Sequence, residues 1–301
     1  MQDPRTLMGV LFALAAYTMW GLMPIYFKQL SHLPALDILM HRVVWSALGL
    51  CLCVSLLVQW HKIRTAFRNR KVMTTLVVAS LLLAVNWVLF IWAVNNDYLL
   101  ESSLGYYINP LFNVLLGRVF LGERLRFAQK CAVAVAAVGV IISVAHYGQL
   151  PWIALCLACS FSIYGLLRKQ VAVDSMPGLF IETLFMLPFA LVYWFLYADA
   201  ASNITTLPFA SSLLLICAGI VTTAPLLCFT AAARRLRYST LGFFQYIGPS
   251  LMFILAIYVY HEPISSARLI TFACVWTALA IFSLDSLRHY RMERRANRAQ
   301  V

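Results

Sequence analysis

Polar side chains recur along the otherwise apolar segment 98–120 at positions that an α-helix would bring onto one face. At 100° per residue they fall within roughly 80° of one another; they are Ser102, Tyr106, Asn109, Asn113 and Gly117. Hydroxyl and amide groups can line a polar cavity, but they also join neighbouring helices through hydrogen bonds, and small residues permit close approach. The sequence leaves both interpretations of this stripe open.

A charged group stands inside a second apolar segment. Arg42 follows His41 within 35–58, and its guanidinium stays charged, so it needs a carboxylate, carbonyl groups or water as partners. Glu101 and Asp37 are candidate partners at a similar depth. The functional hypothesis is an ion pair that a substrate or a proton makes and breaks. The structural alternatives are a permanent pair, or a side chain that extends outward to water.

Four further polar or aromatic side chains are candidates for a site. Glu182 lies in the first turns of segment 178–198; it suits proton coupling, as does Glu101, although a carboxylate is also favoured at a helix start without any function. Asn86 and Gln245 are amides in apolar segments, where polar groups usually face an interior path. Trp20 could stack on an aromatic or amphipathic molecule, although such residues more often pack or anchor helices.

The sequence lacks the patterns of several kinds of chemistry. No GxxxxGK[ST] nucleotide loop occurs. Cys156 and Cys159 have the spacing of metal ligands, but no second pair accompanies them, so no metal and no cofactor are expected. Of six histidines only His41 lies inside an apolar segment, without an evident nucleophile nearby, and no two aspartates do. We therefore do not expect an enzyme.

The composition indicates that the helices of this chain lie in a lipid bilayer. Of 301 residues, 62% are hydrophobic and 11% are charged, whereas soluble domains are about 45–50% apolar and about 25% charged. A membrane-spanning helix needs about 20 mostly apolar residues. The sequence therefore predicts an all-α integral membrane protein of ten transmembrane helices, over residues 7–30, 35–58, 72–94, 98–120, 127–146, 150–168, 178–198, 210–233, 239–260 and 267–286.

The basic residues predict an orientation. With ten spans, all but three of the 23 lysines and arginines fall on the side that holds both termini; the exceptions are Lys28, Arg42 and Arg268. Cationic loops remain cytoplasmic, so both termini are predicted to be cytoplasmic. The net charge of +12 is explained by orientation and by attraction to anionic lipid, so the lipid bilayer, and no nucleic acid, is the expected partner.

Two parts of the chain resemble each other. Pro249 lies 139 residues after Pro110, and Glu123 and Glu262 each follow thirteen residues after these prolines. This offset holds five spans, so the second copy must be inverted in the membrane, an arrangement typical of transporters with a site near the midplane. We predict a first five-helix repeat at 1–148, a second inverted repeat at 149–286 and a basic cytoplasmic tail at 287–301.

Several strings resemble a known family. Ser103–Pro110 followed by Leu121–Leu125 is similar to the first repeat of EamA-type proteins in the drug/metabolite transporter superfamily. The strings His41–Trp45, Asn86–Asn96 and Leu241–Pro249 resemble the RarD subfamily of bacterial permeases. The resemblance, which runs through nearly the whole chain, implies the ten-helix, two-repeat fold, the bacterial inner membrane, and export; RarD-like proteins are associated with chloramphenicol sensitivity or resistance.

Together these observations predict a secondary active transporter that works by alternating access. Its expected substrate is a small molecule: a metabolite, an amphipathic drug such as chloramphenicol, or an amino acid. The predicted translocation path comprises Trp20, His41, Arg42, Asn86, Glu101, Ser102, Tyr106, Asn109, Asn113 and Gln245. The alternatives are a passive channel or a lipid scramblase and, less favoured, an intramembrane enzyme. A homodimer is left unassigned.

Overall fold

The described part of the chain is helical almost throughout. The computed structural model describes residues 4–123, 125–147, 152–197 and 204–261, and beyond them 266, 269–274, 276–278, 280–281, 284–285 and 288. These residues include no strand, which confirms the all-α prediction. Glu262 lies outside the described residues, as does the predicted tail 287–301 apart from Arg288, and their roles remain predictions.

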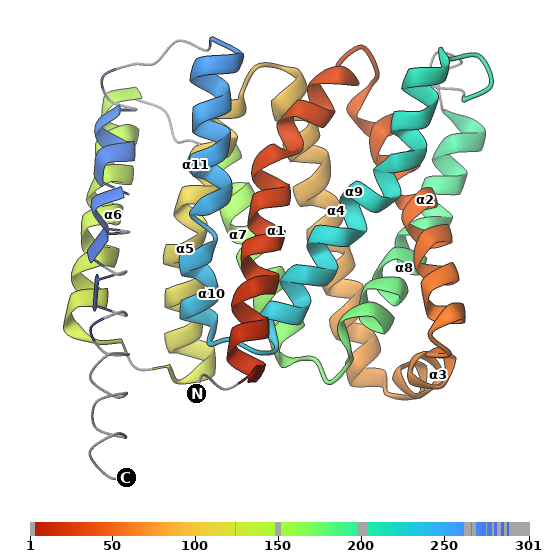
Figure 1. The fold of residues 1–301 in the computed structure, drawn as a ribbon, viewed down its shortest axis with the longest axis horizontal. Coiled ribbons are helices and arrows are strands. Elements are labelled where there is room, and N and C mark those ends of the chain that lie inside the picture. The colour runs from red at the N-terminus through yellow and green to blue at the C-terminus, as the bar shows by residue number, and fades with distance from the viewer. Residues whose placement is uncertain are drawn as a thin grey trace.

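Up to Val259 the described residues form eleven α-helices and one π-helical turn. They are α1 (Pro4–Gln29), α2 (Ala35–Leu56), α3 (Trp60–Arg68), α4 (Arg70–Asn95), α5 (Leu99–Leu121), α6 (Phe127–Tyr147), α7 (Trp152–Gln170), α8 (Ser175–Leu196), α9 (Phe209–Ala233), α10 (Tyr238–Phe244), α11 (Ile247–Ile254) and the π-turn η2 (Leu255–Val259). The long helices stand side by side as one bundle (Figure 1).

The helices agree with the predicted spans. Seven segments in the described residues are long and apolar enough to cross a membrane, and each coincides with one predicted span. Shorter apolar helices over Phe127–Ile142 and Leu269–Ala278 fall within the fifth and tenth. The fourth predicted span is α5, which is 23 residues long but is less apolar because it carries the polar stripe.

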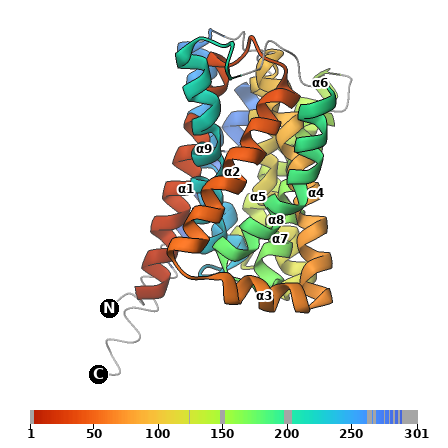
Figure 2. The same ribbon diagram turned by 90° about the vertical axis from the view of Figure 1, so that its right-hand side faces the viewer.

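Helix α3 was not predicted. It is short and carries several charges, so the sequence places it in a loop, yet it crosses one end of the bundle (Figure 2). Its own residues Ile63 and Ala66 are buried, and its Trp60 ring meets the Phe180 ring of α8 edge to face at 5.8 Å. This amphipathic pattern, with the cationic side outward, is typical of a helix at the membrane surface.

The ninth predicted span is broken into two helices. Helix α10 ends at Phe244 and α11 begins at Ile247, so Gln245 and Tyr246 form the junction. Pro249 falls in the first turn of α11, where its missing N–H costs no intrahelical hydrogen bond. Discontinuous helices in transporters commonly line the central site.

The close contacts that shape the interior are made between helices distant in sequence. Helix α1 packs against α9 and α11, α2 against α8 and α9, and α5 against α7, α10 and α11. A Cβ atom added at Gly219 of α9 would lie 2.6 Å from the carbonyl carbon of Trp45 in α2. Two backbones therefore meet there with no room for a side chain, which fixes the register of α2 on α9.

Candidate functional site

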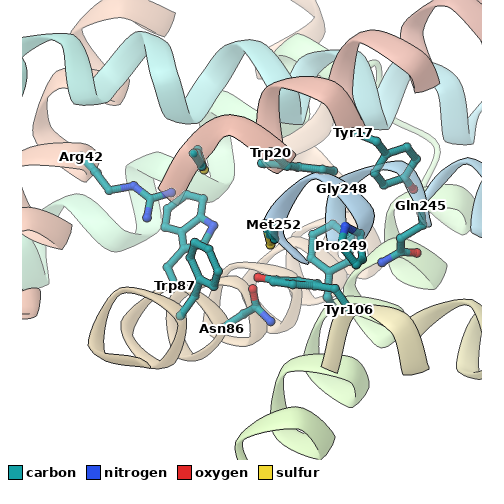
Figure 3. Close-up of a pocket in the computed structure, with 13 residues that line it drawn as sticks. Tyr17, Trp20, Arg42, Asn86, Trp87, Tyr106, Gln245, Gly248, Pro249 and Met252 are labelled. Carbon is teal, nitrogen blue, oxygen red and sulfur yellow. The ribbon is translucent and has the colours of Figure 1, made fainter. Parts of the chain in front are cut away.

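A cavity lies in the interior of the bundle, between helices from both halves of the chain (Figure 3). It holds about 520 Å³ of empty space, its opening included. About 40 Å³ of this is open to the centres of water molecules, which is room for roughly three waters at about 10–15 Å³ each. Its walls are Tyr17, Trp20, Met23, Arg42, Asn86, Trp87, Phe90, Tyr106, Phe161, Gln245, Gly248, Pro249 and Met252.

Arg42 supplies the charge in this cavity. Its side chain is 2% exposed, its Nε donates to Thr222 Oγ1 at 2.8 Å, and its Nη1 has no hydrogen-bond partner. The guanidinium carbon lies 4.6 Å from the centre of the Trp87 ring and 5.1 Å from that of Phe27. Aromatic faces attract cations, so the charge is held by neutral groups.

The carboxylate expected beside Arg42 is not there. Among the residues that the structure describes, none of the five ion pairs includes Arg42. Of the two proposed partners, Asp37 instead accepts a hydrogen bond from the Tyr193 hydroxyl at 2.8 Å, and Glu101 is half-buried and is not among the residues that line the cavity. Arg42 thus keeps its positive charge without a counter-ion from the described chain.

Two amides and a hydroxyl add polar groups to the cavity wall. Asn86 donates from Nδ2 to Ser160 Oγ at 2.9 Å and to the Leu157 carbonyl at 3.1 Å. The Gln245 Oε1 accepts from Asn113 Nδ2 at 2.8 Å, which leaves the Gln245 amide nitrogen on the cavity side (Figure 3). The Tyr106 hydroxyl points towards the same part of the cavity as Asn86 (Figure 3).

Aromatic rings form most of the remaining wall. The Trp20 ring lies 5.3 Å from Phe161 and 5.5 Å from Phe229, and Tyr106 lies 5.5 Å from Phe90 and 6.5 Å from Phe161. These centroid distances are those of favourable aromatic pairs. The cavity therefore offers flat apolar faces around one cation and a few hydrogen-bonding groups.

The predicted site residues separate into two groups. Five line the cavity: Trp20, Arg42, Asn86, Tyr106 and Gln245. Of the stripe on α5, only Tyr106 does so. The other polar members make helix contacts: Ser102 Oγ donates to the Tyr98 carbonyl at 3.1 Å, the Asn109 Oδ1 accepts from Ser162 Oγ at 3.0 Å, and Asn113 bonds Gln245. The polar face of α5 therefore does both: one residue lines the cavity, and the others contact neighbouring helices or their own helix.

His41 and Glu182, like Glu101, do not line the cavity. His41 is buried, and its ring centre is 4.6 Å from that of Trp194 on α8. Glu182 is fully buried beside Arg168 of α7: the closest nitrogen and oxygen are 3.5 Å apart, in contact but without hydrogen-bond geometry. The Tyr164 hydroxyl donates to the other carboxylate oxygen of Glu182 at 3.3 Å.

Sequence reasoning missed several residues that the cavity uses. Thr222 is the hydrogen-bond partner of Arg42. A threonine in an apolar helix usually donates its hydroxyl to a carbonyl of the same helix, so the residue type alone did not indicate a role in the cavity. Tyr17, Phe90 and Phe161 are ordinary packing residues in a membrane sequence. The 139-residue offset relates Met252 and Gly248 to Asn113 and Asn109, so the repeat pointed to these two residues, although they were not predicted as part of the site.

A charged cluster ties together one end of the bundle. Asp174, just before α8, pairs with Lys62 of α3 at 2.7 Å and with Arg234 at the end of α9. Hydrogen bonds from Lys62 and from Arg234 lower the pKa of Asp174 to about 2. Lys169 of α7 donates to the carbonyls of Ala233 and Leu236, the latter at 2.7 Å.

Known proteins resemble this chain over most of its length. Residues 7–145 match the EamA-like transporter family. A protein of Vibrio cholerae described as an uncharacterized transporter is 53% identical, over 96% of each chain. Protein RarD of Escherichia coli is 51% identical over 95% of this chain and 97% of its own.

More distant matches agree. The chloramphenicol-sensitive protein RarD of Pseudomonas aeruginosa is 33% identical over 95% of this chain and 97% of its own. A crystal structure of another protein shares the fold with a TM-score of 0.68 at 18% identity, over 93% of this chain and 98% of that one. Built of apolar helices around a central cavity, and 53% and 51% identical to the Vibrio cholerae and Escherichia coli relatives, the chain belongs to the RarD subfamily of EamA-like transporters, in the drug/metabolite transporter superfamily.

Proposed function

We propose that this membrane transporter is a secondary active carrier that moves a small molecule through the central cavity by alternating access. The observation that carries the proposal is the cavity itself, where a buried cation, amides and aromatic faces from α1, α2, α4, α5, α7 and α11 converge. Walls drawn from both halves of the chain suit such a cycle, because motion of one half against the other would open the cavity on either side.

Contacts at the two ends of the bundle support this cycle. At the end where α1 finishes, Lys28 pairs with Asp97 at 2.6 Å; at the opposite end, Asp174 holds Lys62 and Arg234. Exposed ion pairs contribute only about 0–1 kcal/mol each. They can therefore break and reform at little cost as each end opens.

The orientation follows from the charges at the second end. The start of α1, all of α3 and the end of α9 lie together there (Figure 1). Because cationic segments stay cytoplasmic, we propose that this end faces the cytoplasm and that both termini are cytoplasmic. The likeness to RarD proteins of bacteria supports the bacterial inner membrane as its location. Antiparallel α5 and α10–α11 lie side by side, which supports inverted repeats over 1–148 and 149–286.

The proposed direction of transport is export. The proposed substrate is a small metabolite, an amphipathic drug such as chloramphenicol, or an amino acid. Glu101 and Glu182 are the carboxyl groups proposed for proton coupling. Neither is among the residues that line the cavity, so a proton on either would act by changing contacts between helices.

Counterflow in proteoliposomes tests the carrier. Labelled chloramphenicol and a panel of amino acids are exchanged with and without a pH gradient. We expect saturable exchange of one class of compound, accelerated by unlabelled compound on the opposite side. Flux that neither saturates nor shows counterflow would indicate a channel or scramblase. No flux in vesicles that contain folded protein would refute chloramphenicol and the tested amino acids as substrates.

A further inference from the structure

We infer that the cavity selects a small carboxylate with a flat apolar body, and that Arg42 binds the carboxylate. This inference rests on the proposed carrier function and names its class of substrate. Among the proposed substrates it favours an acidic metabolite over neutral chloramphenicol, and over an amino acid, whose ammonium group would meet Arg42.

The first step is the state of Arg42. A buried charge is costly unless it is paired, and the usual solution is a carboxylate from the same protein. Here Nε is the only nitrogen of the guanidinium that hydrogen-bonds a described residue, and that partner is the neutral Thr222. Nη1 is buried and unpartnered. Nη1 thus remains available for an anion, and a guanidinium binds a carboxylate through two parallel hydrogen bonds when both terminal nitrogens take part.

The second step is the charge of the cavity wall. Arg42 is the only ionic side chain among the residues described as lining it; none is Asp, Glu or Lys. An ammonium group would therefore meet a cation and no counter-ion, and a neutral ligand would leave the buried charge of Arg42 uncompensated. A carboxylate is the group that removes this penalty, so the arrangement discriminates by charge.

The third step is the shape of the rest of the ligand. From Arg42 the cavity continues between the rings of Trp20, Tyr106 and Phe161, which accept a planar group by stacking. Tyr106, Asn86 and Gln245 can fix its orientation through hydrogen bonds. The space open to water centres, about 40 Å³, has room for roughly three waters at about 10–15 Å³ each, which is less than a carboxylate joined to a ring occupies.

Entry of the apolar body therefore requires the walls to part. Met23 and Met252 both line the cavity, and methionine side chains change shape more easily than branched or aromatic ones. We assign the observed geometry to a conformation in which the cavity is too narrow for the whole ligand.

The test uses an acid and its isosteric amide, 3-phenylpropionate and 3-phenylpropionamide, with labelled 3-phenylpropionate counterflow and ligand-dependent thermal stabilisation of the purified protein as measurements. In the unmodified protein we expect the acid to bind at least tenfold more tightly than the amide. Arg42→Gln should weaken binding of the acid by about 10- to 100-fold, the loss of one charge-assisted contact, and leave the amide unchanged.

Two further variants complete the design. Arg64→Gln removes the same charge from an exposed position on α3 and should leave both ligands unaffected. Arg42→Lys should retain partial preference for the acid, because it keeps the charge but loses the planar donors. If Arg42→Gln does not fold, the acid-to-amide ratio in the unmodified protein and in Arg42→Lys decides the question.

The outcomes separate the inference from the carrier proposal. Equal exchange of acid and amide, or an acid preference that survives Arg42→Gln, would overturn the inference and leave the carrier standing. Counterflow of chloramphenicol with no binding of either phenyl compound would do the same. Absence of binding and exchange for every compound, with folded protein, would count against both.

Discussion

The buried pair of Arg168 and Glu182 offers a test of whether Glu182 stabilises the fold or moves a proton. We consider Arg168→Met, Glu182→Leu and the double variant, which replace charged side chains by apolar ones of related volume. Gly178 makes room for the pair, because a Cβ atom at this position would overlap Arg168 Nη1. The site is thus built around the guanidinium, and no solvent reaches it.

The magnitude follows from the burial of the two side chains, which are 1% and 0% exposed. Removing one member of a buried pair costs about 3–5 kcal/mol, because the other charge is left buried, whereas replacing both is often neutral. The contact at 3.5 Å lacks hydrogen-bond geometry, so we expect the lower end, about 3 kcal/mol, for each single variant. The double variant should lose no more than about 1 kcal/mol.

The assay is the free energy of unfolding of the detergent-purified protein in a denaturant titration, with counterflow measured alongside. If the two single losses add in the double variant, or if each is below about 1 kcal/mol, the pair does not act as a unit and this reasoning fails. Glu182→Gln supplies the functional control. Unchanged stability with loss of the response to a pH gradient would assign Glu182 to proton coupling instead.

Three smaller perturbations test other contacts. Because its folded pKa is lowered to about 2, the contribution of Asp174 is present above about pH 4 and lost as pH falls towards 2. Because the Asp174 side chain is 41% exposed, its ion pairs stabilise the fold by no more than about 1 kcal/mol. Asp174→Asn should therefore abolish the fall in melting temperature that these ion pairs cause as the pH drops towards 2. Gly219→Ala should cost about 1–3 kcal/mol by forcing two backbones apart, whereas Gly49→Ala, with open space around it, should not destabilise; equal melting temperatures would contradict this. Asn113→Leu should cost about 1–3 kcal/mol, because it removes the buried 2.8 Å bond to Gln245, and double-mutant analysis of that pair checks the coupling.

Apolar length predicted the helices well because lipid demands it of every span. The same rule could not find α3, whose nine residues are too short and too charged, nor the break at Gln245, where Pro249 served only as a marker of the repeat. A proline in a long apolar segment is compatible with a kink, a break or neither. Contacts with α1 and α5 decide among these.

The site was predictable in its residue types and not in its pairings. The helical angle places Tyr106 and Asn109 on one face, but only the neighbouring helix at each depth decides that Tyr106 meets the cavity and Asn109 meets Ser162. Likewise, the cost of burying Arg42 predicts a partner without identifying it. Thr222 lies 180 residues away, and no local pattern connects the two.

The placement of Arg42 also bears on how a substrate would drive the cycle. A ligand shifts a conformational equilibrium only by its difference in affinity for the two states. Arg42 stands on α2, bonded to α9 through Thr222, whereas Tyr106 and Phe161 belong to α5 and α7. A carboxylate held at Arg42 with its ring against those residues would join the two helix groups and favour the closed state. A ligand with only one of these parts would bind without joining them, so the acid should accelerate exchange where a small carboxylate without a ring should not.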